Sequence, residues 1–128
     1  MKLTSDELYA FFEKELEKNQ AFSLDWKFSA EDTVFNIKEV IPSLNISCTQ
    51  ATQIYGEWIE KVTINDMEYS FNIESETLII ELIRNTNQHI ATKNQTLVTW
   101  DYLGDEYNFI LIKLDELPKY EEMGFYKI

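Results

Sequence analysis

Hydrophobic positions along the chain repeat with two different periods, which predicts a mixture of helices and strands. Near the N-terminus the apolar residues fall at helical spacing, at Leu8, Phe11, Phe12 and Leu16. Thr4 and Glu7 precede this stripe at the spacing of a capping box, so a helix is predicted from Thr4 to about Lys18. A second helix is expected to begin at Ser75. Its apolar stripe comprises Leu78, Ile79, Leu82 and Ile83.

Apolar and polar residues alternate along residues 22–28, 44–48 and 67–73, which predicts strands there. Strands are also predicted at residues 33–40, 57–64, 96–102 and 107–114. The two-residue connection Asn65-Asp66 predicts that the strands on either side of it form a hairpin. The last two strands are expected to form a second hairpin. Because residues 107–114 are almost all apolar, that strand is predicted to be buried on both of its faces.

The order of these elements predicts a single α+β domain over residues 1–128. We expect a mostly antiparallel sheet of about five to seven strands, packed with two main helices. A length of 128 residues, 45% of them hydrophobic, is sufficient for a core without disulfides or metals. No apolar run approaches the ~20 residues that span a membrane. No signal peptide is recognised and Cys48 is the single cysteine, so a cytoplasmic location is expected.

Acidic side chains outnumber basic ones by 23 to 11, giving a formal net charge of -12. The resulting field repels nucleic acid and anionic membranes, and it attracts a basic partner and accelerates the encounter with it. Solubility alone is an equally good explanation of such a charge, because net charge does not determine the fold.

The residues of the common catalytic and metal sites are scarce in this sequence. His89 is the only histidine and lies near a predicted helix end, where histidines cap carbonyl groups or face solvent. One histidine and one cysteine cannot build a four-ligand zinc site. The adjacent carboxylates lie at predicted turns and helix starts, where they are expected to be solvated or capping. We therefore predict a protein that is not an enzyme and that needs no metal or cofactor.

Aromatic and acidic residues alternate around the second predicted hairpin. The candidate partner-binding residues there are Trp100, Asp101, Tyr102, Asp105, Glu106 and Tyr107. Large rings beside carboxylates suit an interface with a basic protein, since the rings provide buried contact and the acids provide charge complementarity. The alternative is a core hairpin whose rings point inward. The first hairpin offers a second candidate set, formed by Tyr55, Glu57, Trp58 and Glu60.

In size, acidity and acid–aromatic stretches such as residues 100–107, the chain resembles the small acidic immunity proteins of bacterial polymorphic and contact-dependent toxin systems. The resemblance implies a protein that binds a cognate toxin, often a basic nuclease, and covers its active site or a nearby surface. Two other functions stay open. One is a nucleic-acid mimic that antagonises a DNA-binding enzyme, and the other is a small-molecule-binding α+β domain.

Overall fold

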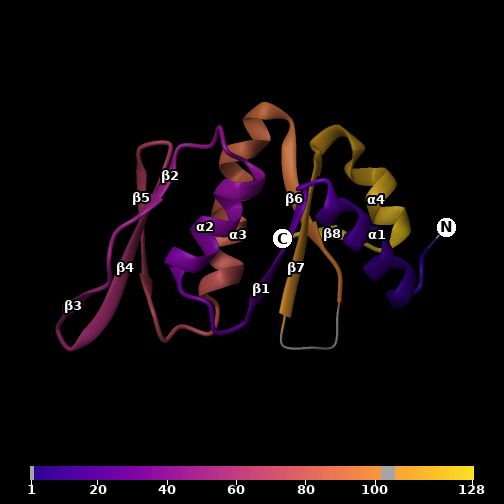
Figure 1. Cartoon of the computed structure of the whole chain (residues 1–128). Coiled ribbons are helices and arrows are strands. Elements are labelled where there is room, and N and C mark those ends of the chain that lie inside the picture. Colours follow the sequence, from indigo (N-terminus) through magenta and orange to yellow (C-terminus); the bar gives the residue numbers. More distant parts are fainter. Residues whose placement is uncertain (1, 102–105) are drawn as a thin grey trace.

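The computed structural model describes residues 2–101 and 106–128 (Figure 1). The helices in these residues are α1 (Ser5–Glu17), α2 (Ala30–Val40), α3 (Leu78–Ile90) and α4 (Leu117–Met123), with 3-10 turns η1 (Ala91–Lys93) and η2 (Leu114–Glu116). The strands are β1 (Ala21–Asp25), β2 (Ile46–Cys48), β3 (Thr52–Ile54), β4 (Glu57–Ile64), β5 (Met67–Asn72), β6 (Gln95–Thr99), β7 (Glu106–Lys113) and β8 (Tyr126–Lys127). The predicted α+β class is confirmed.

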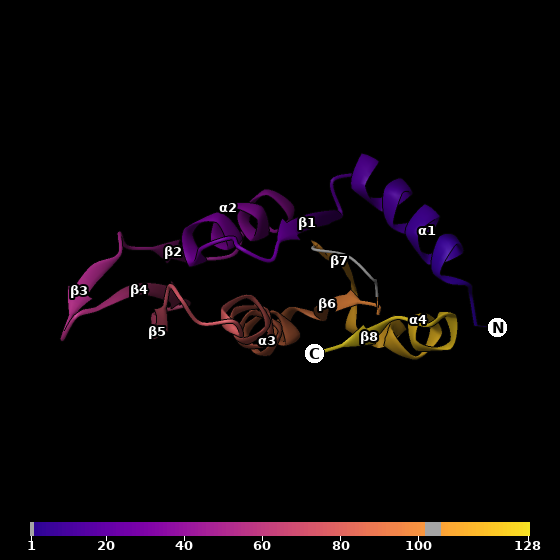
Figure 2. The same ribbon diagram turned by 90° about the horizontal axis from the view of Figure 1, so that it is seen from below.

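The strands of the described residues form two antiparallel sheets rather than one. Sheet A has the order β1-β7-β6-β8. In sheet B, β2 and β3 pair with one side of β4, and β5 pairs with the other. Figures 1 and 2 show four layers in succession: sheet B, then α2 with α3, then sheet A, then α1 with α4. Two hydrophobic cores fill the spaces on either side of sheet A.

Sheet A is covered by helices on both faces, which explains the composition of its central strands. Phe109, Ile110, Leu111 and Ile112 of β7 are all buried. Phe109 and Leu111 belong to the core that faces α2 and α3, whereas Ile110 and Ile112 belong to the core that faces α1. The prediction of a strand buried on both faces is therefore confirmed for β7.

The strand predicted for residues 33–40 is wrong, because these residues form most of helix α2. A capping box starts the helix: the Ser29 hydroxyl accepts a hydrogen bond from Asp32 N at 3.2 Å, and the Asp32 carboxylate accepts one from Ser29 N at 3.3 Å. Val34, Ile37 and Val40 then fall on one buried face at helical spacing. The cap and the helical spacing of the apolar residues therefore determine a helix where the sequence analysis predicted a strand.

Other elements agree with the sequence more closely. The capping box of Thr4 and Glu7 begins α1 as predicted. Asn65 and Asp66 both have positive φ, as the two central residues of a tight β-hairpin turn require, and they connect β4 to β5. Helix α3 begins at Leu78, two residues later than predicted, because Thr77 rather than Ser75 occupies its N-cap.

Asn87 joins α3 to sheet A through its buried amide. Its Nδ2 donates to Leu97 O at 3.1 Å, and its Oδ1 accepts from Leu97 N at 2.7 Å. Nδ2 also donates to Ile128 O at 3.4 Å, which ties the C-terminal residue to the same helix. One side chain thus satisfies both buried backbone groups of Leu97 and also contacts Ile128.

Candidate functional site

Trp100, the first aromatic of the predicted binding hairpin, lies in the core. Its side chain is only 4% exposed. Its ring centroid is 5.6 Å from those of Phe12 in α1 and Phe125 beyond α4. The hypothesis that Trp100 is an exposed anchor for a partner is therefore corrected: because helices cover both faces of sheet A, this ring packs inside the protein.

The other candidate residues around the second predicted hairpin differ in how exposed they are. Asp101 is exposed and its Oδ1 accepts a hydrogen bond from the Tyr126 hydroxyl at 3.0 Å. Burial and this carboxylate together raise the pKa of Tyr126. Tyr107 is half-buried and stacks on Phe109, with ring centroids 6.4 Å apart. Glu106 is exposed. Tyr102 and Asp105, also in the predicted set, lie outside the described residues.

The second candidate set was placed on the β4–β5 hairpin, but Tyr55, Glu57 and Trp58 lie at the turn of a hairpin that was not predicted, β3–β4, where both aromatic residues are on the surface. Tyr55 and Gly56 form its turn, both with positive φ, and the Tyr55 side chain is fully exposed. Trp58 is 47% exposed, which is unusual for so large an apolar side chain. Glu57 beside it is exposed as well. This hairpin extends beyond the ends of α2 and α3 in Figure 1.

Two loops bring further apolar side chains to the same end of the molecule. The connection between β1 and α2 carries Trp26, which is 52% exposed, and the connection between β5 and α3 begins with Ile73, 40% exposed. Both side chains line a hollow of about 230 Å³. Ile73 N also donates to Trp58 O at 3.0 Å, which continues the β4–β5 ladder and holds the hollow beside the hairpin.

Acidic residues lie among these exposed apolar side chains. Glu74 and Glu76 line the same hollow, and Glu57 begins β4. Asp25 and Glu106 are both exposed and lie opposite each other at the end of the β1–β7 pair, directly before Trp26. We call this region the hairpin-end surface. Its members are Asp25, Trp26, Ile54, Tyr55, Glu57, Trp58, Ile73, Glu74, Glu76 and Glu106.

Lys27 is a basic residue within this acidic region. Its ammonium lies over the Trp26 ring, 5.2 Å from the centroid. This cation–π contact covers part of an exposed ring in the free protein. A partner that binds Trp26 would displace or share this lysine.

Trp26 and Ile73 were not among the residues predicted for a site. Both continue the alternation of a predicted strand, at residues 22–28 and 67–73, and both were assigned to strands for that reason. The strands end earlier, at Asp25 and Asn72. The two residues therefore lie in loops, and no periodic signal in the sequence marks that change.

Glu60, which also belonged to the second candidate set, is not a surface residue. It is 3% exposed, and its carboxylate accepts hydrogen bonds from Ala30 N at 3.0 Å and Glu31 N at 3.3 Å. These are orphan N–H groups of the first turn of α2, where a negative charge is favourable. Glu60 therefore joins sheet B to α2.

The residues most suited to catalysis are engaged in structural contacts. Cys48 lies 3.8 Å from the Glu60 carboxylate. Burial, followed by the charges of Glu60 and Glu31, raises the pKa of Cys48 to about 12, so its thiol is protonated at neutral pH. His89 Nε2 lies 2.7 Å from the Tyr69 hydroxyl, in a hydrogen bond between α3 and β5.

Among residues 2–101 and 106–128, no three His, Cys, Asp or Glu side chains come together in a way that could hold a metal ion. Within the same residues, none of the helices has both the length and the apolar character needed to cross a bilayer.

Comparison with known proteins identifies the family. The model of the domain of unknown function DUF6630 matches residues 3–125, nearly the whole chain, so the protein belongs to this family. No curated protein and no solved structure matches the chain.

Proposed function

For this DUF6630 protein we propose a binding function: it neutralises a basic protein partner, as an immunity protein does when it blocks a bacterial toxin. The observation that carries the proposal is the hairpin-end surface, where Trp26, Tyr55 and Trp58 are exposed among carboxylates. The net charge of -12 supports a basic partner rather than an acidic one.

The exposed rings supply the affinity in this proposal. Tryptophan and tyrosine are enriched among the residues that dominate binding energy, because they bury a large area and lose little rotamer entropy. Trp26 and Trp58 are each about half exposed, so each has apolar surface left to bury against a partner. Exposed apolar side chains gathered at one end of a protein indicate an interaction site, whereas single ones need no explanation.

The acids around the rings supply attraction and orientation. Glu57, Glu74 and Glu76 are exposed: Glu74 and Glu76 line the hollow that Trp26 lines, and Glu57 precedes Trp58 at the start of β4. We take these acids as the polar rim of the surface. Charges at a rim mainly change the association rate and its dependence on salt. Asp25 and Glu106 extend the acidic rim along the end of sheet A.

The proposal is tested by capturing partners from the lysate of the source cell with three tagged chains: wild type, Trp58→Ala and Phe35→Ala. Phe35 is the matched control, because it is 65% exposed on α2 and lies outside the hairpin-end surface. We expect wild type and Phe35→Ala to retain the same stoichiometric basic protein at low salt, and Trp58→Ala to lose it. The recovered protein is then assayed for an activity that the wild-type chain inhibits.

Two outcomes contradict this proposal. A partner retained equally by all three chains would show that the hairpin-end surface is not the interface. The absence of any partner at low salt and at high salt would favour a small-molecule-binding domain instead.

A further inference from the structure

Strand β5 forms an edge of sheet B that no other strand of residues 2–101 and 106–128 pairs with. Its partner is β4, in a register that places Tyr69 opposite Val62 and Phe71 opposite Glu60. Because the two-residue turn makes Ile64 and Met67 a hydrogen-bonded pair, the backbone groups of Met67, Tyr69 and Phe71 point toward β4. The N–H and C=O groups of the alternating residues Glu68 and Ser70 therefore point away from the sheet.

No hydrogen bond within the described part of the chain uses the backbone groups of Glu68 or Ser70. The other edge strands of the two sheets, within the described residues, are shorter. Strands β2 and β3 have three residues each, β8 has two and β1 has five. Long free edges are usually protected by proline, a bulge, charged side chains or a covering element. The six residues of β5 contain no proline and one charged residue, the exposed Glu68.

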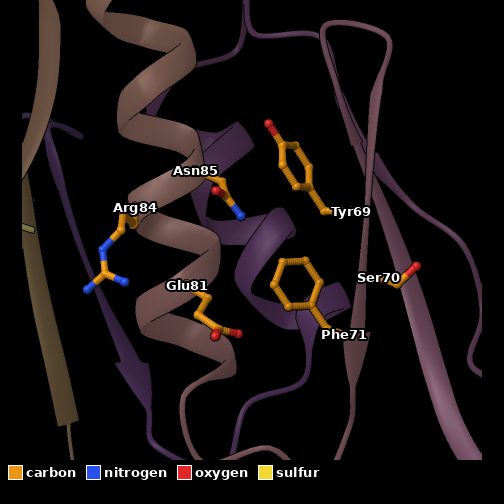
Figure 3. A pocket seen from close by; sticks show the side chains of 6 residues that line it. All are labelled: Tyr69, Ser70, Phe71, Glu81, Arg84 and Asn85. Carbon is orange, nitrogen blue, oxygen red and sulfur yellow. The ribbon is translucent and has the colours of Figure 1, made fainter.

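A groove runs between this edge and α3. It has a volume of about 320 Å³ and is lined by Tyr69, Ser70, Phe71, Glu81, Arg84 and Asn85. Figure 3 shows the Tyr69 and Phe71 rings turned toward α3 and the Ser70 side chain turned away from it. Glu81 and Asn85 reach from α3 toward the two rings, whereas the Arg84 guanidinium points away from them.

The side chains that face the groove differ from one another in what they can bind. The Glu81 carboxylate and the Asn85 amide make no hydrogen bond or ion pair within residues 2–101 and 106–128, so both are available to a ligand. Tyr69 is already held by His89 and offers the side of its ring. The groove thus offers the two rings and the Glu81 carboxylate, with the Arg84 guanidinium at its margin, pointing away from the rings.

We propose that the β5 edge binds an extended segment of a basic protein, which adds to sheet B as a further strand. Its backbone would pair with the free groups of Glu68 and Ser70, and alternate side chains would enter the groove. A lysine or arginine among them would reach Glu81. The choice of a basic partner rests on the proposed function, whereas strand addition at β5 rests on the free edge and the groove.

The test selects binders from phage-displayed linear nine-residue peptides on the intact protein and remakes the best one as an acetylated, amidated peptide. We expect selected peptides to contain lysine or arginine between β-branched residues. Ser70→Pro removes an N–H that points away from β4, so it should weaken binding at least about tenfold. Ser70→Ala keeps the N–H and should bind like wild type, and Glu81→Gln should weaken binding about threefold or more.

A second measurement uses the wild-type protein, so it does not depend on how well Ser70→Pro folds. Each backbone nitrogen of the synthetic peptide is methylated in turn. Strand addition predicts that methylation weakens binding at every second residue only, because alternate N–H groups face β5. Equal tolerance at all positions would overturn the proposal.

Three further outcomes would also overturn it. One is a selection that enriches no peptide. Another is a peptide that binds Ser70→Pro as well as wild type but fails to bind Trp58→Ala, which would place the peptide on the hairpin-end surface. The third is a wild-type dimer in sedimentation that Ser70→Pro converts to a monomer, which would make a second copy of the chain the occupant of the edge.

Discussion

The carboxylate of Glu60 accepts a hydrogen bond from the backbone N–H of Ala30 at 3.0 Å, and this contact joins two layers of the protein. Glu60 lies in the middle of β4 and faces inward, and Ala30 is the first residue of α2. A second N–H, from Glu31, approaches the same carboxylate. The positive end of the helix thus compensates a buried negative charge that would otherwise be costly.

Replacing Glu60 should destabilise the protein far more than replacing an exposed acid of the same strand. Glu60→Ala leaves two N–H groups of α2 without partners, so the free energy of unfolding should fall by about 2–4 kcal/mol. Glu57→Gln, at an exposed position of β4, should change it by less than about 0.5 kcal/mol. Urea unfolding followed by circular dichroism measures both values. Equal, small effects would show that the contact does not stabilise the fold.

Cys48 should be almost unreactive in the folded protein. With a pKa of about 12, only about one thiol in a thousand is ionised at pH 9, whereas about half are ionised in an unfolded chain with a pKa near 9.0. Alkylation by iodoacetamide at pH 9 should therefore be at least about 100-fold slower in buffer than in urea. Glu60→Gln removes one of the charges that raise this pKa and should increase the rate. Fast labelling of the folded wild type would contradict this.

The raised pKa of Cys48 also affects the stability of the protein at high pH. The folded pKa of Cys48 lies above the unfolded value, so the stabilisation that this thiol contributes is complete below about pH 9. It is lost as the pH rises from about 9 toward 12. Cys48→Ser or Cys48→Ala removes the titrating thiol and should make the urea midpoint less dependent on pH in that interval. If the urea midpoints of wild type and variant changed with pH in the same way between about pH 9 and 12, the raised pKa of Cys48 would be contradicted.

Asn87 and Asn85 provide a matched pair of substitutions on one helix. Asn87→Ala leaves the N–H and C=O of Leu97 buried without their partner, and the free energy of unfolding should fall by about 2–3 kcal/mol. Asn85→Ala, at a groove position without hydrogen bonds in the described residues, should cost less than about 1 kcal/mol. Urea unfolding measures both losses of stability. A larger loss for Asn85→Ala than for Asn87→Ala would contradict the stabilising role of the Asn87 hydrogen bonds.

The tryptophans should separate into a core residue and two surface residues. Trp100→Ala should cost about 3–5 kcal/mol because it empties a space between Phe12 and Phe125. Trp58→Ala should change stability by less than about 1 kcal/mol. Acrylamide quenching tests the same difference: a variant that keeps only Trp58 or only Trp26 should be quenched strongly, and one that keeps only Trp100 weakly. Similar quenching in all three would contradict the burial of Trp100.

Local signals in the sequence were sufficient for several elements. The capping box at Thr4 predicted α1, and the two-residue connection Asn65-Asp66 predicted the β4–β5 hairpin, because both depend on neighbouring residues alone. The α2 segment also had such a signal in Ser29 and Asp32, yet a strand was predicted for residues 33–40. A capping box followed by apolar residues at helical spacing should therefore be interpreted as a helix.

The candidate site depends on tertiary structure, and the sequence did not contain it in a readable form. Trp100 and Trp58 both occur in alternating segments, yet one is buried and the other is half exposed. The difference arises because helices cover both faces of sheet A, whereas the end of β4 extends beyond α2. Glu60 and Ala30 are 30 positions apart, so no local pattern could reveal their contact.

The central claim is that acids beside exposed rings attract a basic partner to the hairpin-end surface. It is tested most directly by the association rate constant of the captured partner between about 20 mM and 500 mM salt. Wild type is compared with the variant carrying Glu57→Gln, Glu74→Gln and Glu76→Gln. We predict a wild-type rate that falls about tenfold or more with salt, and a variant that is slower at low salt and less salt-dependent. Identical rates and slopes for the two chains would contradict the claim.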